Sequence, residues 1–182
     1  MTRPEMVVLL DEHHAAIGQV RKDEVHGAAT PLHLAFSCYV LDQQGRLLVT
    51  RRALSKLTWP GVWTNSFCGH PAPDEPVSAA VIRRAEQELG ARISEPRITL
   101  PHFRYRAVDA SGIVENEVCP VYVARLESDL SPAPEEVADW EWVDPIELAS
   151  SVALTPFAFS PWLQEQLPQL IAAEAINLED SA

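Results

Sequence analysis

Residues 75–90 read Glu75-Pro-Val-Ser-Ala-Ala-Val-Ile-Arg-Arg-Ala-Glu-Gln-Glu-Leu-Gly90 and contain the clearest helix signal of the chain. Pro76 suits the first turn of a helix, Glu75 places negative charge at its positive end, and Gly90 suits its C-terminal cap. The apolar residues recur at helical spacing and form one buried stripe: Val77, Ala80, Val81 and Ala85. We therefore predict a helix over residues 76–89.

Strand patterns lie on both sides of this helix. Hydrophobic runs bounded by turn residues predict strands over 7–10, 17–20, 33–41, 46–50, 64–68, 97–107, 114–125 and 138–143. His33 falls on the polar face of its strand, and Pro120 suggests an edge or a bulge. Further helices are expected over 145–150 and over 159–175, the latter interrupted at Pro168. Mostly hairpin-linked strands with inserted helices indicate an α+β fold.

The composition is that of one globular domain, which we expect to span residues 1–182, with 47% hydrophobic and 22% charged residues. No apolar run approaches the roughly 18 residues of a membrane span. The short apolar stretch near the N-terminus is followed at once by acids, unlike a signal peptide. A net charge of −12 argues against a nucleic-acid partner. Three widely spaced cysteines indicate a reducing cytoplasm.

The charges are distributed unevenly along the chain. All 14 Lys and Arg residues lie between Arg3 and Arg125, where 14 acids balance them. Residues 126–182 hold 12 acids and neither Lys nor Arg. The basic groups are therefore concentrated where a small anion could be held, and the acidic region is most simply a solvated surface.

Three histidines and two glutamates suggest a metal site. Glu115 and Glu117 are separated by one residue on an expected strand, so both project from one face. With His26, His33 and His70 they would fill most of an octahedral site for Mn²⁺, with Zn²⁺ or Fe²⁺ as alternatives. Each residue taken singly is more often a surface or core residue, and the sequence alone does not prove that the five meet.

Cys68 lies next to Gly69 and His70, at the junction of an expected strand with a loop. A thiol in that position can be exposed and polarised by a nearby cation. The alternative is a small buried hydrophobe, which is how we interpret Cys38 and Cys119.

The spacing of Gly69, Glu75 and Arg83 resembles the start of a Nudix box, because five and then seven residues separate them. In that family the glutamates that follow the arginine bind Mg²⁺ against a diphosphate. Here Arg84 and Gln87 stand at two of those positions, and only Glu88 keeps its place. The pattern favours a site that holds a diphosphate without cutting it, although Arg84 and Glu88 could also form a plain surface ion pair.

Further cations precede this segment. Arg51, Arg52 and Lys56 follow an expected strand, and Lys22 lies upstream. Arginine forks and lysine point charges commonly hold diphosphate oxygens.

Taken together, these stretches resemble the type I isopentenyl-diphosphate Δ-isomerases, a family of the Nudix superfamily. The resemblance covers the chain from about Val7 to Trp162, and its most specific motifs are Cys68-Gly-His70 and Glu115-Asn-Glu117. It implies a mixed β-sheet core flanked by helices in one domain, with a catalytic core over about residues 30–165. Residues 176–182 are expected to form a frayed acidic end.

The resemblance also implies a reaction. The double bond of isopentenyl diphosphate moves to give dimethylallyl diphosphate, so one proton is added and another removed on opposite faces. The matching catalytic residues are Cys68 and Glu117, with Tyr105 hydrogen-bonded near the carboxylate. Trp162 would stabilise the tertiary carbocation by cation–π attraction.

The cofactors and binding residues follow from the same resemblance. A divalent metal would be held by His26, His33, His70, Glu115 and Glu117. A Mg²⁺ ion on the diphosphate would be held by Glu88 and the backbone carbonyl of Cys68. The expected substrate cations are Lys22, Arg52, Lys56 and Arg84, with Arg51 and Arg83 as alternatives. The implied partner is a small prenyl diphosphate, without a membrane, nucleic acid or obligatory protein partner.

Two other function classes stay open at this point. A Nudix diphosphohydrolase is suggested by the spacing from Gly69 to Gly90, and it predicts phosphate release. A metal- or nucleotide-sensing module that kept the fold predicts that Cys68→Ala changes no activity. Cys-Gly-His and Glu-Asn-Glu together argue against such a module, because binding alone needs no thiol opposite a carboxylate.

Overall fold

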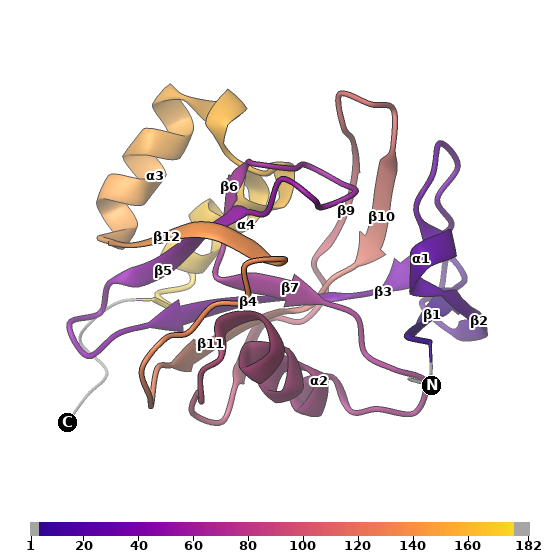
Figure 1. Cartoon of the computed structure of the whole chain (residues 1–182), viewed down its shortest axis with the longest axis horizontal. Helices are drawn as coiled ribbons and strands as arrows, with labels where there is room; N and C mark the ends of the chain where they lie inside the picture. The colour runs from indigo at the N-terminus through magenta and orange to yellow at the C-terminus, as the bar shows by residue number, and fades with distance from the viewer. Residues whose placement is uncertain (1–3, 177–182) are drawn as a thin grey trace.

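The computed structural model describes residues 4–176, which form two β-sheets with flanking helices (Figure 1). One sheet has the strand order β2-β1-β3-β10-β9. Its strands are β1 (Met6–Leu10), β2 (Ala16–Arg21), β3 (His33–Leu34), β9 (Arg104–Val108) and β10 (Val114–Val118). The other has the order β12-β5-β4-β11-β8, with β6 paired to β5 and β7 to β4. Its strands are β4 (Phe36–Leu41), β5 (Leu47–Arg52), β6 (Trp63–Thr64), β7 (Phe67–Gly69), β8 (Arg97–Leu100), β11 (Val121–Arg125) and β12 (Val137–Val143).

Three strands that the sequence predicts as continuous are divided between the two sheets. The 33–41 segment breaks at Ala35, the 97–107 segment at 101–103, and the 114–125 segment at Cys119 and Pro120. The prediction of an edge or bulge at Pro120 is wrong, because this residue lies at a break between β10 and β11. Hydrogen bonds from Ala35 N to Val118 O (2.9 Å) and from Ser37 N to Pro120 O (3.1 Å) keep the two segments together across the change of sheet.

The register of these strands brings the expected site residues side by side. The parallel pairing of β3 with β10 places His33 beside Glu117, and the antiparallel pairing of β10 with β9 places Glu117 opposite Tyr105. In the second sheet, Ser37 of β4 pairs with Cys68 of β7. The imidazole, carboxylate and thiol groups therefore come from strand segments at the junction of the two sheets.

The helix predicted over 76–89 is present in two parts. The α-helix α2 (Val77–Arg84) continues as a π-helical turn, η1 (Ala85–Leu89), and ends at Gly90 with φ of +57°. The short α1 (Lys22–Val25) was not predicted. The α3 helix (Pro145–Leu154) begins where expected but extends past residue 150.

The C-terminal helix differs from its prediction in one respect. A 3₁₀ turn, η2 (Pro156–Ala158), precedes α4 (Pro161–Ala172), and Ser160 caps α4 by accepting a hydrogen bond from Leu163 N (3.4 Å). The expected interruption at Pro168 is wrong, because α4 continues through it. Leu163, Leu167 and Leu170 are all 0% exposed, and their packing outweighs the hydrogen bond that a proline removes.

The helices cover both faces of the seven-stranded sheet (Figure 1). On one face, Leu148 and Val152 of α3 pack with residues of α4 into one core cluster. On the other face, Ala80 and Val81 of α2 belong to a second cluster with Phe36. The expected α+β fold, with a mixed-sheet core flanked by helices in one domain, is thus confirmed.

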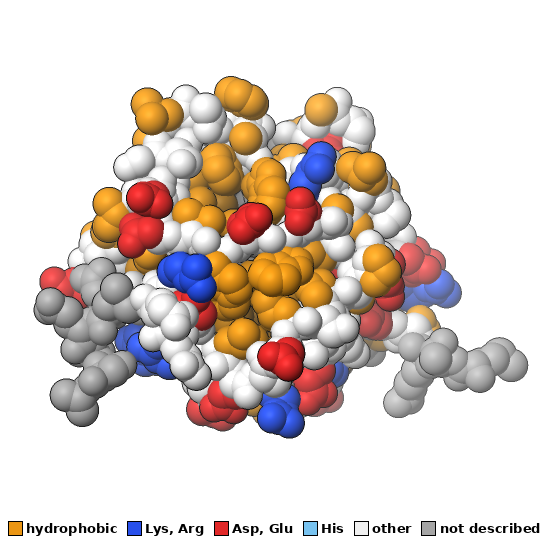
Figure 2. Space-filling view, turned by 60° about the vertical axis from the view of Figure 1, so that its left-hand side comes forward, with side chains coloured by type: hydrophobic (Ala, Val, Ile, Leu, Met, Phe, Trp, Pro, Cys, Tyr) orange, Lys and Arg blue, Asp and Glu red, His pale blue; other side chains and the backbone are white. Residues whose placement is uncertain are grey.

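The acidic region has the surface character that the sequence suggests. Of its acids within the described residues, all are exposed except Glu136, which is half-buried. Figure 2 shows acidic side chains scattered among hydrophobic and uncharged ones on one face. Within residues 4–176, no helix combines the length and hydrophobicity needed to cross a bilayer.

The chain end is packed for longer than expected. Ile176, the first residue of the expected frayed end, is 2% exposed and belongs to the core cluster with Leu170. The boundary therefore moves by at least one residue. Residues 177–182 lie outside the described part of the chain.

Gly90 has a conformational role that can be tested. Its left-handed backbone disfavours side chains, and a Cβ there would lie 2.3 Å from the backbone oxygen of Ser131. That segment cannot easily withdraw, because Ser131 N donates to Leu89 O (2.8 Å). We expect Gly90→Ala to lower the free energy of unfolding by more than the roughly 1–2 kcal/mol cost of a left-handed alanine, measured by urea denaturation.

Gly112→Ala is the matched control. Gly112 also has a positive φ, +87°, but a Cβ there would meet nothing within 4 Å. In Gly112→Ala the free energy of unfolding should fall only by the backbone cost of a left-handed alanine. Equal losses in the two variants would show that the contact with Ser131 is relieved without penalty.

Candidate active site

A cavity of about 660 Å³ is lined by residues of both sheets. Apart from His33 and the two alternative cations Arg51 and Arg83, all of the site residues predicted from the sequence line it. They are His26, His70, Glu115 and Glu117; Cys68, Tyr105 and Trp162; and Lys22, Arg52, Lys56, Arg84 and Glu88. His33 is 0% exposed, and its Nε2 lies 3.3 Å from Glu117 Oε1, so the polar strand face on which it was expected is buried against other polar side chains.

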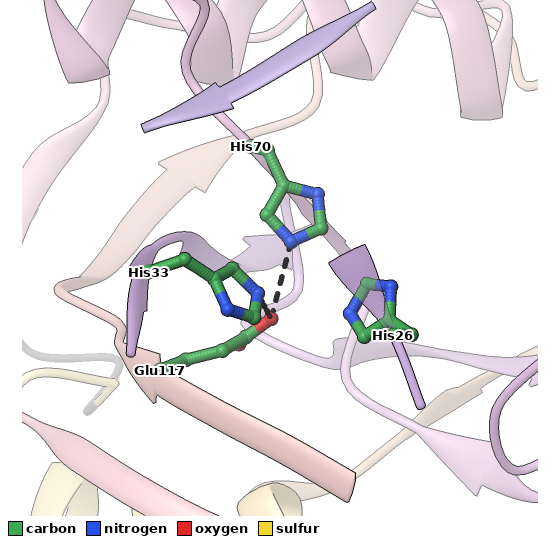
Figure 3. Close-up of side chains that lie close together, drawn as sticks. All are labelled: His26, His33, His70 and Glu117. Atoms are coloured by element: carbon green, nitrogen blue, oxygen red, sulfur yellow. Dashed lines mark hydrogen bonds and ion pairs between the residues drawn. The ribbon is translucent and has the colours of Figure 1, made fainter. Parts of the chain in front are cut away.

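Four of the five expected metal ligands form one cluster (Figure 3). His26, His33, His70 and Glu117 each offer one donor atom, and these atoms all lie within 4.8 Å of one another. The Glu117 carboxylate points between two imidazoles, with Oε1 3.2 Å from His70 Nε2 (Figure 3). Three imidazoles and a carboxylate make a donor set that fits a divalent metal ion.

The ring of His33 is held in the orientation that a metal ligand needs. Its Nδ1 lies 2.9 Å from Pro31 O, and because a carbonyl only accepts, Nδ1 carries the proton. Nε2 is then left with its lone pair directed into the cluster, where no hydrogen-bond partner is found for it among the described residues despite its burial. A backbone carbonyl that fixes the tautomer of a ligating imidazole is a usual supporting contact in metal sites.

Glu115 stands beside the cluster rather than within it. Its Oε2 lies 2.9 Å from His26 Nε2, so the carboxylate contacts one of the imidazoles directly. The four-residue cluster does not include it. The five expected residues therefore lie close together. Four of them supply the clustered donor atoms, and the fifth, Glu115, contacts one of those four.

Burial and contacts set the protonation of this cluster. Burial raises the pKa of Glu117, but the close contacts with His33 and His70 outweigh burial and hold it well below its ordinary value. Burial lowers the pKa of His70. Burial also disfavours the charged form of His33, but its contact with Glu117 raises its pKa overall.

Cys68 is a half-buried thiol with two polar partners. Its Sγ lies 3.4 Å from Ser37 Oγ and donates to Asn65 Oδ1 over 3.3 Å. Burial raises its pKa to about 12, the charge of Glu117 acts in the same direction, and Ser37 opposes them in part. Cys38 and Cys119 are buried, as expected from the sequence.

Aromatic rings form one wall of the cavity. Trp162 is 2% exposed, and its ring centroid lies 5.7 Å from that of Tyr105 and 5.5 Å from that of Trp59. The Arg52 guanidinium carbon lies 5.5 Å from the Trp162 centroid. Tyr105 is opposite Glu117 on the neighbouring strand, but the expected hydrogen bond between them is not formed within the described residues. Burial and the nearby carboxylates raise the pKa of Tyr105 instead.

Three of the four expected substrate cations are held by carboxylates, whereas Arg52 Nε donates to the backbone oxygen of Thr58 (3.0 Å). Arg84 pairs with Glu88, with Nε 3.0 Å from Oε1, and its Nη2 lies 3.3 Å from Glu136 Oε1. Lys56 also pairs with Glu136, and Lys22 Nζ lies 2.6 Å from Glu5 Oε2.

The two alternative cations lie outside the cavity. Arg51 Nε donates to Gly61 O (3.0 Å), and Arg83 Nε pairs with Glu75 Oε1 (2.8 Å). Neither residue lines the cavity among the described residues.

Among the residues of the site that were not predicted from the sequence, three make contacts with predicted ones. Glu5 and Glu136 pair with cavity cations, and Asn65 accepts hydrogen bonds from both Cys68 and Trp162. Asn65 lies inside the stretch 59–70, whose motif indicated a functional segment. Nothing in the sequence, however, indicates that the Asn65 side chain is buried. Glu136 stands in an acidic run, where solvent exposure is the normal expectation.

Comparison with known proteins agrees with this geometry. Residues 31–165 match the family model of the NUDIX domain. A crystal structure from Deinococcus radiodurans superposes with a TM-score of 0.70 at 21% identity, covering 91% of this chain and 98% of that one. A MutT NUDIX hydrolase from Burkholderia pseudomallei superposes with a TM-score of 0.59 at 22% identity, covering 76% and 98%. At these identities the structures show the fold alone. The family-model match covers more than half of the chain, so the chain is a NUDIX-domain protein.

Proteins of similar sequence show which family of NUDIX-domain proteins the chain belongs to. A protein of Paenarthrobacter aurescens is 57% identical over 100% of this chain and 99% of its own length. Another from Clavibacter michiganensis is 61% identical over 95% and 89%, and one from Klebsiella pneumoniae is 52% identical over 95% and 94%. All three are named isopentenyl-diphosphate Delta-isomerase. The chain belongs to the isopentenyl-diphosphate Delta-isomerase family.

Proposed function

We infer that this chain is an enzyme that converts isopentenyl diphosphate to dimethylallyl diphosphate. The observation that carries the proposal is that a thiol, Cys68, and a carboxylate, Glu117, line one cavity that also holds cations. Moving a double bond by one position needs a proton given at one carbon and a proton taken at another. The names of the close relatives support the same reaction.

The two reacting groups differ in their protonation. Burial keeps the pKa of Cys68 far above neutrality, so its sulfur holds a proton in the free protein. The imidazoles around Glu117 keep its pKa low, so its carboxylate is ionised. Paired groups whose pKa values are pushed apart are typical of acid–base sites. The site therefore contains one proton to give and one group able to receive.

We further propose that His26, His33, His70 and Glu117 hold a divalent metal, with Glu115 supporting it and Mn²⁺ as the expected ion. Such an ion would favour the ionised carboxylate of Glu117 and fix its orientation. The chain's own contribution is a prepared set of donors: Pro31 fixes the His33 tautomer, and Glu115 contacts His26.

The cationic side of the cavity is proposed to hold the diphosphate. Arg52, Lys56, Arg84 and Lys22 line this side together with Glu88. Mg²⁺ is expected to accompany the diphosphate, held by Glu88 and the carbonyl of Cys68. Trp162 would face the carbocation formed after protonation, where an aromatic ring contributes on the order of 2 kcal/mol in a dry site.

Lys56 gives the proposed binding site a pH dependence. Burial lowers its pKa to about 8, so its ammonium is charged below that pH and neutral above it. Because kcat/KM reports ionisations of the free enzyme, we expect it to fall above pH 8 by up to about tenfold per pH unit. Steady-state rates between pH 6 and 10 measure this.

Lys56→Arg is the matched control, because a guanidinium stays charged throughout this range. The alkaline fall should then move to higher pH. Identical profiles in the two proteins would assign the fall to another group.

The reaction itself is tested by proton exchange. The purified protein is mixed with isopentenyl diphosphate, Mg²⁺ and Mn²⁺ in D₂O, and the product is followed by NMR. Deuterium-labelled dimethylallyl diphosphate is the expected result. Release of free phosphate would instead support the Nudix diphosphohydrolase alternative. That function is disfavoured by Arg84 and Gln87, which stand where the Nudix box has glutamates.

A further inference from the structure

The carboxamide of Asn65 joins two parts of the site that no sequence motif connects. Its side chain is 0% exposed. Its Oδ1 accepts hydrogen bonds from Cys68 Sγ (3.3 Å) and from Trp162 Nε1 (2.9 Å). A third donor, Thr64 Oγ1, lies 2.9 Å from the same oxygen. One buried oxygen therefore contacts both the thiol and the indole of the cavity wall.

The orientation of this carboxamide is determined by its other end. Asn65 Nδ2 donates to Cys38 O (3.0 Å) and to Phe67 O (2.8 Å). A flipped amide would place Oδ1 against these two carbonyl oxygens and Nδ2 against the indole N–H, which can only donate. The acceptor must therefore face Cys68 and Trp162.

The direction of the thiol proton follows from the same reasoning. An amide oxygen has no hydrogen to give, so the S–H bond of Cys68 points at Asn65. On its other side, Sγ faces Ser37 Oγ, which accepts a hydrogen bond from Gln166 Nε2 (3.0 Å). The sulfur is thus held between two buried polar groups, each oriented by a further hydrogen bond.

We propose that Asn65 is a positioning residue, which fixes the Cys68 thiol and the Trp162 ring relative to each other for the isomerisation. The inference rests on the proposed function. The Cys68 sulfur, which transfers a proton, and the face of the Trp162 ring, which stabilises the cation, must contact the same small substrate. A misplacement of 1 Å can cost about 100-fold in rate, and Asn65 is the shared contact that prevents it.

The test compares Asn65→Ala with Ser66→Ala. Ser66 is the adjacent residue and also 0% exposed, but within residues 4–176 its Oγ hydrogen-bonds only with backbone atoms, Leu48 O (2.7 Å) and Val40 N (2.8 Å). We expect Asn65→Ala to lower kcat by about 100-fold with KM changed less than threefold. Ser66→Ala should lose thermal stability but keep kcat within about twofold of wild type.

Spectroscopy separates positioning from general damage. The S–H stretching band of Cys68, assigned by difference against Cys68→Ala, should move to higher frequency in Asn65→Ala as its hydrogen bond is lost. The indole N–H resonance of Trp162, assigned with Trp162→Phe, should move upfield. Neither signal should move in Ser66→Ala.

The outcomes are distinct. An unchanged kcat in Asn65→Ala, with both signals shifted, would overturn the positioning role. Equal loss of kcat in the two variants would also overturn it, because it would assign the effect to folding. A wild-type protein without isomerase activity would contradict the proposed function instead.

Discussion

Deuterium incorporation into dimethylallyl diphosphate should fall by about 10²–10⁴-fold when Cys68 is replaced by alanine, the range expected for loss of one general acid–base group. The thiol lines the cavity and carries a proton at neutral pH. Alanine can neither give nor accept that proton. KM should change little, since the cations that face the diphosphate are untouched. The measurement is the NMR assay in D₂O.

Cys119→Ala is the matched control for this prediction. Cys119 lies on the other side of Ser37, with its Sγ 3.3 Å from the same hydroxyl that contacts Cys68. It is 1% exposed and, within the described residues, does not line the cavity. Its loss should affect stability rather than turnover. If both alanine variants kept full activity, the thiol would have no role in proton transfer.

Glu117→Gln should have an effect of at least the same size. The amide keeps the shape of the side chain but does not accept the substrate proton at neutral pH. It also removes the only carboxylate of the four-donor cluster. We expect turnover to fall by about 10³–10⁴-fold. The affinity for the metal should fall by more than the roughly 10–100-fold that follows loss of a supporting residue. The metal content of the protein after dialysis measures this loss.

Two comparisons make this result specific. Glu141→Gln makes the same chemical change at an exposed position on β12, in the sheet that does not carry His33 and Glu117, and should leave both readouts unchanged. Glu115→Gln tests the neighbour that contacts His26 and should lose less metal than Glu117→Gln. Full metal content and full turnover in Glu117→Gln would contradict both proposed roles of this carboxylate.

The fold was predictable where local rules decide the structure. The helix beginning at Val77 and its end at Gly90 follow from side-chain period and cap chemistry. The division of three long strands between two sheets could not be predicted, because apolar alternation continues through a bend. The persistence of α4 through Pro168 depends on tertiary packing, which sequence rules do not contain.

The site was predictable to the extent that its chemistry is unusual. Imidazoles, a thiol and paired glutamates are conspicuous in a sequence, and the structure brings them to one cavity. Asn65 and Glu136 are common residue types whose importance depends on what they face. Burial of a polar side chain among specific partners results from the fold, so it leaves no local signature.

The passage of two chain segments from one sheet to the other limits how this site can change. One segment carries His33 and Ser37, and the other carries Glu117 and Cys119. Inserting one residue at Ala35 or Pro120 would shift one group past its counterpart by about 3.3 Å, more than a hydrogen bond can absorb. Natural variants should therefore differ in length at surface turns such as 109–112 and keep these two crossings invariant in length.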